Sequence, residues 1–288
     1  MVERKTISWF NILNVAIMLI IVIVTLFPFL YMINVSLSSP EYIIRGEVAL
    51  WPKGFSLDMY QKVFEDSRIW IGYKNTILYT CLGTFFSLII TAMGGYALSR
   101  KGLWLGRFFM YMIVFTMLFS GGMIPTFLVV KQLGLMDTIW AMVVPGLVSV
   151  WNLIIMRTFF QGLPGEIIES GKIDGLNDIG IFIRLVLPLS KAVLATIALF
   201  YAVGIWNNFF SAFLYLRDAS LFPLQVALRN LVLGGQMNES FAGSDADVVV
   251  LESLKFAAII VSTLPILLTY PFIQKYFVKG VMIGSVKG

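Results

Sequence analysis

The chain alternates between apolar stretches without any charged residue and segments that hold every charge. Six stretches contain no Asp, Glu, Lys or Arg, and each is 19 to 25 residues long. They are residues 12–34, 75–99, 108–130, 138–156, 192–213 and 256–274. At about 1.5 Å per residue, a helix of this length crosses roughly 30 Å of hydrocarbon and satisfies its own backbone there. The pattern predicts an all-α, polytopic membrane protein with six transmembrane helices.

The composition supports a membrane protein. Of 288 residues, 59% are hydrophobic and only 13% are charged, whereas about a quarter of the residues in a typical soluble domain are charged. A charge at the centre of a membrane helix costs about 2.5 to 3.5 kcal/mol on insertion scales, so its exclusion from all six stretches is expected. A large soluble core is a poor alternative, because it would leave almost no sequence to form a surface.

The distribution of Lys and Arg predicts that both termini are cytoplasmic. With the N-terminus inside, the inner segments hold 12 Lys and Arg in 68 residues, and the outer segments hold 9 in 89 residues. The inner connection 100–107 contains three basic residues and no acidic one. This bias follows the positive-inside rule, so we expect a multi-pass protein of the cell membrane. The net charge of +5 then needs no nucleic-acid partner.

The chain lacks the residue types of common catalytic and metal sites. It has no histidine, and Cys81 is its single cysteine, which excludes His-based triads, HExxH zinc sites and cysteine zinc sites. Residues 170–172 read Ser-Gly-Lys, but Glu166 and Ile173 replace the glycine and the hydroxyl residue of a phosphate-binding loop. We expect no catalytic residue, metal or cofactor on this chain. Energy for any transport must come from a partner or an ion gradient.

The connection between the fourth and fifth predicted helices has helical signals of its own. Pro164 suits the first position of a short helix over Glu166–Ile173, and Asp174-Gly175 favours a turn. Asn177 or Asp178 can cap a second helix. The apolar positions of this second helix predict a stripe along one face: Ile179, Phe182, Ile183, Val186 and Leu187.

Two interpretations of this helix–turn–helix segment compete. An amphipathic connector resting on the bilayer would favour a basic polar face, whereas this one is mixed in charge. Small residues, Ser170, Gly171 and Gly175, stand beside Glu169 and Asp174 and would let another backbone approach closely. We therefore favour a docking surface for a cytoplasmic protein.

The same residues resemble a known motif. Glu169-Ser170-Gly171, then Asp174-Gly175, then Leu187 to Lys191 are similar to the EAA motif of ABC importer permeases, E-A-A-x-x-D-G followed by L-P-L. Ser-Gly replaces the usual Ala-Ala, and Ala192 replaces a common proline. Other strings extend the resemblance over nearly the whole chain, toward the smaller maltose permease and the lipoprotein-associated complex-oligosaccharide permeases. They are GGMIPTFLVVKQLGL (121–135), PGLVSVWNLIIMRTFF (145–160), ALFYAVGIWNNFFSAFLYL (198–216), PLQVALRN (223–230) and QKYFVKGVMIGSVKG (274–288).

The resemblance implies a type I ABC importer transmembrane domain over residues 1–288. Within it, 12–34 would be a peripheral first helix, 75–274 the core and 166–189 a cytoplasmic coupling loop. The residues expected to dock on an ATPase are Glu166, Glu169, Ser170, Gly171, Lys172, Asp174 and Gly175. The resemblance also implies that the C-terminal tail contacts the ATPase through Gly284, Lys287 and Gly288.

The function implied is that of a permease subunit, not an enzyme. It would form half of a translocation pathway for a carbohydrate, an oligosaccharide, delivered by an extracellular solute-binding protein. Its other partners would be a second, non-identical permease subunit, membrane lipid and a cytoplasmic ATPase dimer that binds ATP and Mg²⁺. The alternatives are a secondary carrier driven by an ion gradient without an ATPase, and a membrane enzyme, which would need converging ionisable residues that the sequence does not offer.

Trp206, Asn207 and Asn208 are candidates for the substrate path. They fall within the fifth predicted helix, where adjacent amides are costly to expose to lipid. They could stack on and hydrogen-bond a sugar, or they could bond a neighbouring helix. The outer connection 214–255 could be a flexible probe toward the binding protein or a passive linker.

Helix-bending residues occur in the third and sixth predicted helices. Gly121-Gly122 and Pro125 lie in the third, and Pro265 and Pro271 lie in the sixth. A gating helix would bend at such residues, although membrane helices also tolerate them for packing alone.

Overall fold

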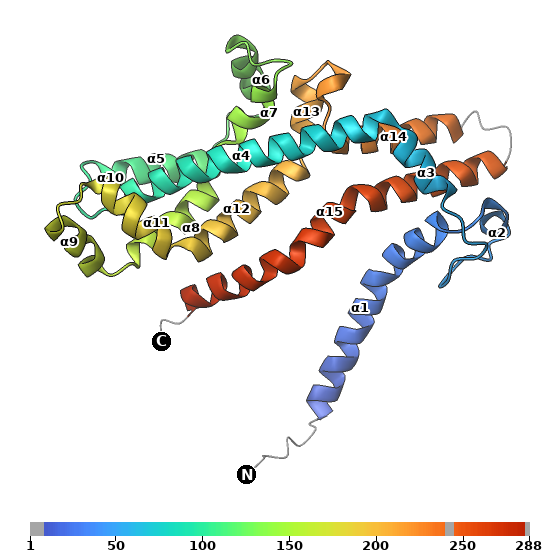
Figure 1. Ribbon diagram of the computed structural model, residues 1–288, viewed down its shortest axis with the longest axis horizontal. Helices are drawn as coiled ribbons and strands as arrows, with labels where there is room; N and C mark the ends of the chain where they lie inside the picture. Colours follow the sequence, from blue (N-terminus) through green and yellow to red (C-terminus); the bar gives the residue numbers. More distant parts are fainter. Residues whose placement is uncertain (1–8, 240–244, 286–288) are drawn as a thin grey trace. The chain divides into compact units, whose positions relative to one another are not determined.

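The computed structural model describes residues 9–239 and 245–285, in which every regular element is a helix (Figure 1). An isolated bridge joins Ser38 to Phe55. The helices are α1 (Trp9–Ser36), α2 (Pro40–Ile44), α3 (Asp58–Glu65), α4 (Ser67–Ser99), α5 (Gly106–Leu118), α6 (Met123–Gln132), α7 (Ile139–Val143), η1 (Val144–Gly146), α8 (Val150–Gln161), α9 (Gly165–Ile173), α10 (Asp178–Ile181), η2 (Phe182–Val186), α11 (Leu187–Leu189), α12 (Lys191–Trp206), α13 (Phe210–Tyr215), η3 (Ala219–Leu221), α14 (Leu224–Glu239) and α15 (Asp245–Ser285). The all-α class predicted from the sequence is confirmed.

The chain forms two compact units, which are described separately. The first comprises residues 1–69 and 228–264, and the second comprises 70–227 and 265–288. Helices α1 to α3 belong to the first unit. Both candidate functional regions described below lie in the second unit.

The helices provide up to six membrane spans. Three stretches are long and apolar enough to cross alone: α1, α4 and Val249–Thr269 of α15. Three more spans arise if each pair of helices bent at a short break is counted as one. The bend is 113° between α5 and α6, 52° between η1 and α8, and 84° between α11 and α12. The apolar stretch of α1 is 0% buried, as suits a helix surrounded by lipid.

The predicted spans at residues 108–130, 138–156 and 192–213 are interrupted helices rather than continuous ones. Each of these stretches is broken by residues that disfavour helix: Gly121-Gly122, Pro145-Gly146 and Asn207-Asn208. Gly122 has φ +84°, a conformation that side chains rarely adopt. The six stretches are identified by the absence of charged residues, which are costly in hydrocarbon. Gly, Pro and Asn are uncharged, so they end a helix without ending a charge-free stretch.

The outer connection 214–255 is largely helical. Helix α14 and the first turns of α15 fill most of it, although residues 240–244 lie outside the described part of the chain. A flexible segment is therefore the wrong description of its described portion. A contact between this connection and the solute-binding protein remains a prediction.

The core of the second unit packs α4 against α8 and α12. Tyr96, Met156 and Tyr201 are buried there. A Cβ on Gly95 would lie 3.0 Å from Met156 Cγ and 3.2 Å from Arg157 N, so the glycine lets α4 and α8 approach closely. Small residues at helix contacts serve this purpose in lipid, where association depends on packing rather than on the hydrophobic effect.

Candidate functional site

Helix α9 and the turn after it have the geometry of a defined docking element. Gly175 has φ +78°, its N–H donates to Lys172 O at 3.0 Å, and Leu176 N–H donates to Gly171 O at 2.9 Å. This is the Schellman arrangement that ends a helix at a glycine, so the predicted Asp174-Gly175 turn is confirmed. Asn177 Oδ1 then caps α10 by accepting from Gly180 N at 2.7 Å.

The start of α9 differs slightly from the prediction. The helix begins at Gly165, and Pro164 is its N-cap with ψ 133°, not its first helical residue.

One face of α9 packs on its own chain. Gly171 is buried, and a Cβ there would lie 2.8 Å from Leu185 Cδ1 and 2.9 Å from Ile181 Cγ1. Ile167 and Ile168 are partly buried on the same side. The interpretation of Gly171 as a surface for another backbone is therefore corrected: the close approach it permits is that of α10 and η2.

The opposite face of α9 is exposed and carries an acid–apolar pattern. Glu166, Glu169 and Ser170 are exposed, as are Lys172 and Asp174 at the end of the helix. Ile173, which sequence reasoning does not single out, is 85% exposed. It lies one helical turn from Glu169, so spacing could have placed it on this face. A large apolar side chain this exposed beside carboxylates suits a protein contact.

The stripe predicted for the helix after the turn is wrong. Ile179 and Ile183 are 68% and 55% exposed, whereas Ile181 and Val186 are almost fully buried. The reason is that Phe182–Val186 forms a π-helix, so α-helical spacing does not apply. Pro188 accounts for the wide turn, since it has no N–H to donate to residue 184. Ser190 Oγ donates to Val186 O at 2.7 Å and satisfies that buried carbonyl.

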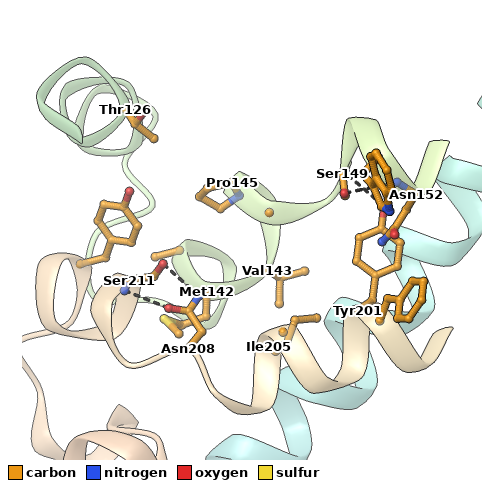
Figure 2. Close-up of a pocket in the computed structure, with 16 residues that line it drawn as sticks. Thr126, Met142, Val143, Pro145, Ser149, Asn152, Tyr201, Ile205, Asn208 and Ser211 are labelled. Carbon is orange, nitrogen blue, oxygen red and sulfur yellow. Dashed lines mark hydrogen bonds between the residues drawn. The ribbon is translucent and has the colours of Figure 1, made fainter. Parts of the chain in front are cut away.

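A pocket of about 680 Å³ lies where the three broken spans meet (Figure 2). Its walls come from α6, α7, η1, α8, α12 and α13. The lining residues are Thr126, Ala141, Met142, Val143, Pro145, Gly146, Ser149, Trp151, Asn152, Phe200, Tyr201, Gly204, Ile205, Asn208, Ser211 and Tyr215. Irregular backbone at membrane depth is tolerated where it lines a cavity, and two helix breaks line this one: that before α8, with Pro145, Gly146 and Ser149, and that after α12, with Asn208.

The polar groups of this pocket are neutral. None of its lining residues, all within the described chain, is an acid or a base. Ser149 N–H donates to Tyr201 Oη at 2.9 Å, and Tyr201 Oη lies 2.7 Å from Thr91 Oγ1, which fixes the break before α8 to α12 and α4. Asn152 lies one turn beyond Ser149 (Figure 2). Amides, hydroxyls and aromatic rings are the groups that hold uncharged hydroxylated ligands.

Of the three residues predicted for the substrate path, only Asn208 lines the pocket. Its Oδ1 accepts a hydrogen bond from Ser211 N–H at 3.1 Å, and its Nδ2 donates one to Ser211 Oγ at 3.0 Å. Asn207 is exposed and donates to Val203 O at 2.9 Å, while Trp206 is buried and its indole N–H has no acceptor among the described residues. Trp206 lies in the helix as expected, whereas Asn207 and Asn208 lie beyond it, because α12 ends at Trp206.

Several pocket residues escape the sequence reasoning. Ser149 and Asn152 lie in the charge-free stretch 138–156 and Tyr201 in 192–213. These residues could have been identified from the sequence as uncharged polar residues within predicted membrane spans. The predicted tail contact is untested: Gly284 lies in α15, but Lys287 and Gly288 lie outside the described residues.

A carboxylate joins two segments beside the pocket. Asp137 Oδ1 accepts from the backbone N–H groups of Arg217 and Asp218, each at 2.9 Å. Asp137 N–H donates to the carbonyl of the pocket residue Tyr215 at 2.9 Å. The hydrogen bonds from Asp218 and Arg217 lower the pKa of Asp137 below its usual value. This contact ties the segment before α7 to the end of α13.

We expect acid to weaken this contact. Because the pKa of Asp137 is lower in the folded than in the unfolded chain, its contribution to stability is present above about pH 3.9 and is lost as the pH falls through the folded-state pKa. Asp137→Asn keeps an acceptor and tolerates the residue's φ of +60° but does not titrate. Thermal unfolding followed by tryptophan fluorescence should show the wild type more stable at pH 7, with a difference that shrinks toward pH 3. A difference independent of pH contradicts this assignment.

Comparison with known proteins gives consistent matches along the chain. Residues 70–283 match the family described as binding-protein-dependent transport system inner membrane component. The chain is 44% identical over 284 residues to the polygalacturonan/rhamnogalacturonan transport system permease protein YtcP of Bacillus subtilis (strain 168), covering 97% of this chain and 98% of the relative. It is 45% identical over 266 residues to protein LplC of the same organism, covering 92% and 90%.

A solved structure also resembles it. The match is a chain from the crystal structure of a bacterial ABC transporter involved in the import of the acidic polysaccharide alginate. The TM-score is 0.87 at 36% identity, covering 93% of this chain and 96% of that chain.

Proposed function

From the premise that this chain belongs to the family of binding-protein-dependent transport system inner membrane components, we propose that it forms half of the translocation pathway of an oligosaccharide importer. It is a membrane permease and not an enzyme. Importers of this family combine such a permease with a partner permease, an ATPase and a solute-binding protein. We further propose that the partner permease is non-identical, that both termini are cytoplasmic, and that ATP and Mg²⁺ bind only to the ATPase.

The observation that carries this proposal is the neutral pocket between the three broken spans. Two helix breaks, the one before α8 with Pro145, Gly146 and Ser149 and the one after α12 with Asn208, place backbone and polar groups at one cavity instead of toward lipid. The names of the relatives refer to polygalacturonan, rhamnogalacturonan and alginate, so an acidic oligosaccharide is the substrate class we propose. The uncharged lining suits its hydroxyls and ring faces.

The exposed face of α9 is the proposed docking surface for the ATPase. Glu169 and Glu166 would pair with basic groups of the ATPase. Ile173 would enter an apolar pocket of the ATPase that lies between those basic groups. A buried apolar anchor ringed by polar contacts is the usual arrangement of a strong interface. The secondary-carrier alternative has no support from the relatives.

The pocket assignment is tested with two asparagines. We expect Asn152→Ala to reduce uptake of radiolabelled trigalacturonate by about two- to tenfold at subsaturating concentration, as follows from losing one hydrogen bond of about 0.5 to 1.5 kcal/mol. Uptake is measured in cells that carry the complete importer.

The matched control is Asn207→Ala, which removes an amide that is exposed and outside the pocket. Its uptake should remain near that of the wild type. Immunoblots of the membrane fraction verify equal amounts of each variant. Equal losses in both variants, or none in Asn152→Ala, would argue against a substrate path through this pocket.

A further inference from the structure

A second pocket of about 730 Å³ lies at the end of α4, between the α4–α5 connection and the start of α10. It shares no residue with the pocket at the helix breaks. Its lining residues are Met93, Tyr96, Ala97, Arg100, Lys101, Gly102, Leu103, Lys172, Asp178, Ile179 and Phe182. The proposed function leaves this pocket unexplained.

The pocket is strongly basic. Arg100, Lys101 and Lys172 face a single acid, Asp178. In the part of the chain that the structure describes, none of these four residues forms an ion pair. The site therefore has a net charge of +2 with no internal partner, which favours an anionic ligand.

Arg100 carries the most specific information. Its Nε and Nη2 atoms are buried and have no hydrogen-bond acceptor among the described residues. Its guanidinium carbon lies 4.0 Å from the ring centre of Tyr96, a cation–π contact that orients the group but accepts none of its N–H donors. Buried donors without acceptors are costly, so they point to a missing partner. A guanidinium fork matches the oxygens of a phosphate, which it can bind through two parallel hydrogen bonds.

The remaining wall of the pocket is apolar and open. Met93 and Ile179 are 57% and 68% exposed, and Leu103 is 38% exposed. Because α4 is a candidate span that ends at Ser99, this wall lies at the level where a bilayer's headgroups begin. The neighbouring Trp104, 82% exposed, is of the residue type that is enriched at this level.

We propose that this pocket binds the phosphodiester headgroup of an anionic phospholipid. The phosphate accepts hydrogen bonds from Arg100, with Lys101 and Lys172 adding charge, and the upper acyl chains cover Met93, Leu103 and Ile179. Basic pockets at the membrane surface recognise lipid headgroups in this way. An acidic side chain of another protein would neutralise the cations but would leave the apolar wall uncovered. Since Lys172 lies on α9, the bound lipid would connect the end of α4 to the docking helix.

The proposal can be tested on the purified full chain, without the importer's partners. Native mass spectrometry of the chain in detergent, titrated with phosphatidylglycerol or with phosphatidylcholine of the same acyl chains, gives the affinity for each lipid. We expect tighter binding of phosphatidylglycerol, and a loss of at least about fivefold in that affinity for Arg100→Gln and for Lys101→Gln, as follows from about one basic residue's contribution at a membrane surface. Lys101 is exposed, so its variant reports on binding even if Arg100→Gln folds poorly.

Arg107→Gln is the matched control. It makes the same charge change just past the α4–α5 connection, at an exposed residue outside the pocket, and should leave the affinity unchanged. An equal loss in Arg107→Gln would show general attraction to a basic surface and overturn the proposal, as would equal binding of the two lipids. Competition by soluble glycerophosphoglycerol at the same concentration as the lipid would also overturn it, because the site would then bind a soluble phosphodiester as well as it binds the lipid.

Discussion

Replacing Glu169 by lysine is expected to abolish substrate uptake and release the ATPase while the chain still inserts into the membrane. Glu169 lies on the exposed face of α9, and its side chain makes no hydrogen bond or ion pair among the described residues, so the substitution should not disturb the fold. Losing one partner of an interfacial charge pair costs about 2 to 5 kcal/mol, which weakens ATPase association by at least about 25-fold. Co-purification of the ATPase with the tagged permease measures the association, and uptake of labelled oligosaccharide measures the function.

The control for this experiment is Glu41→Lys. Glu41 is an exposed acid in the short helix α2, far along the chain from α9, and its reversal should leave ATPase recovery and uptake unchanged. Immunoblots establish that both variants reach the membrane equally. Normal ATPase recovery with Glu169→Lys would refute docking through this face of α9.

Replacing Gly171 by leucine is expected to have a comparable effect for a different reason. Since a Cβ alone would approach Leu185 and Ile181 to within 2.9 Å, a larger side chain must push α9 away from α10 and η2. Overpacking of this kind costs about 1 to 3 kcal/mol. If the cost falls on the docked position of α9, uptake decreases by about 5- to 150-fold. The stability of the purified chain, measured by thermal unfolding, should also decrease.

Gly165→Leu is the matched control, because a Cβ on this glycine at the start of the same helix meets nothing within 4 Å. It should retain uptake and stability. Gly171→Ala should give a smaller change than Gly171→Leu and in the same direction. Wild-type uptake in Gly171→Leu would mean that the contact between α9 and α10 does not position the docking face.

The sequence predicts those features for which a single free-energy cost is large and local. A charge in hydrocarbon is costly, so charge-free stretches such as 75–99 identify spans directly. A backbone conformation with positive φ strongly favours glycine, so Asp174-Gly175 predicts the turn that ends α9. The bend at Gly121-Gly122 is recognisable for the same reason.

Features that depend on smaller or more distant effects are not predictable in this way. The π-helix at Phe182–Val186 is accounted for by Pro188, which has no N–H to donate to residue 184, and a period of 3.6 residues assigns Ile179 and Ile183 to the wrong face. The burial of Gly171 depends on Ile181, ten residues away. Likewise, nothing local distinguishes Asn208, in the pocket, from Asn207, outside it; only the meeting of three spans does.

The π-helix also bears on how the length of this region can change during evolution. A residue in an α-helix turns the chain by about 100°, so an insertion or deletion elsewhere between Asp178 and Leu189 would rotate Ile181 out of register with the helices that follow. A wide turn already holds one residue more than an α-helical turn, and losing one residue from it would leave both flanking helices in phase. Natural deletions of one residue between Asp178 and Leu189 are therefore expected to concentrate at Phe182–Val186.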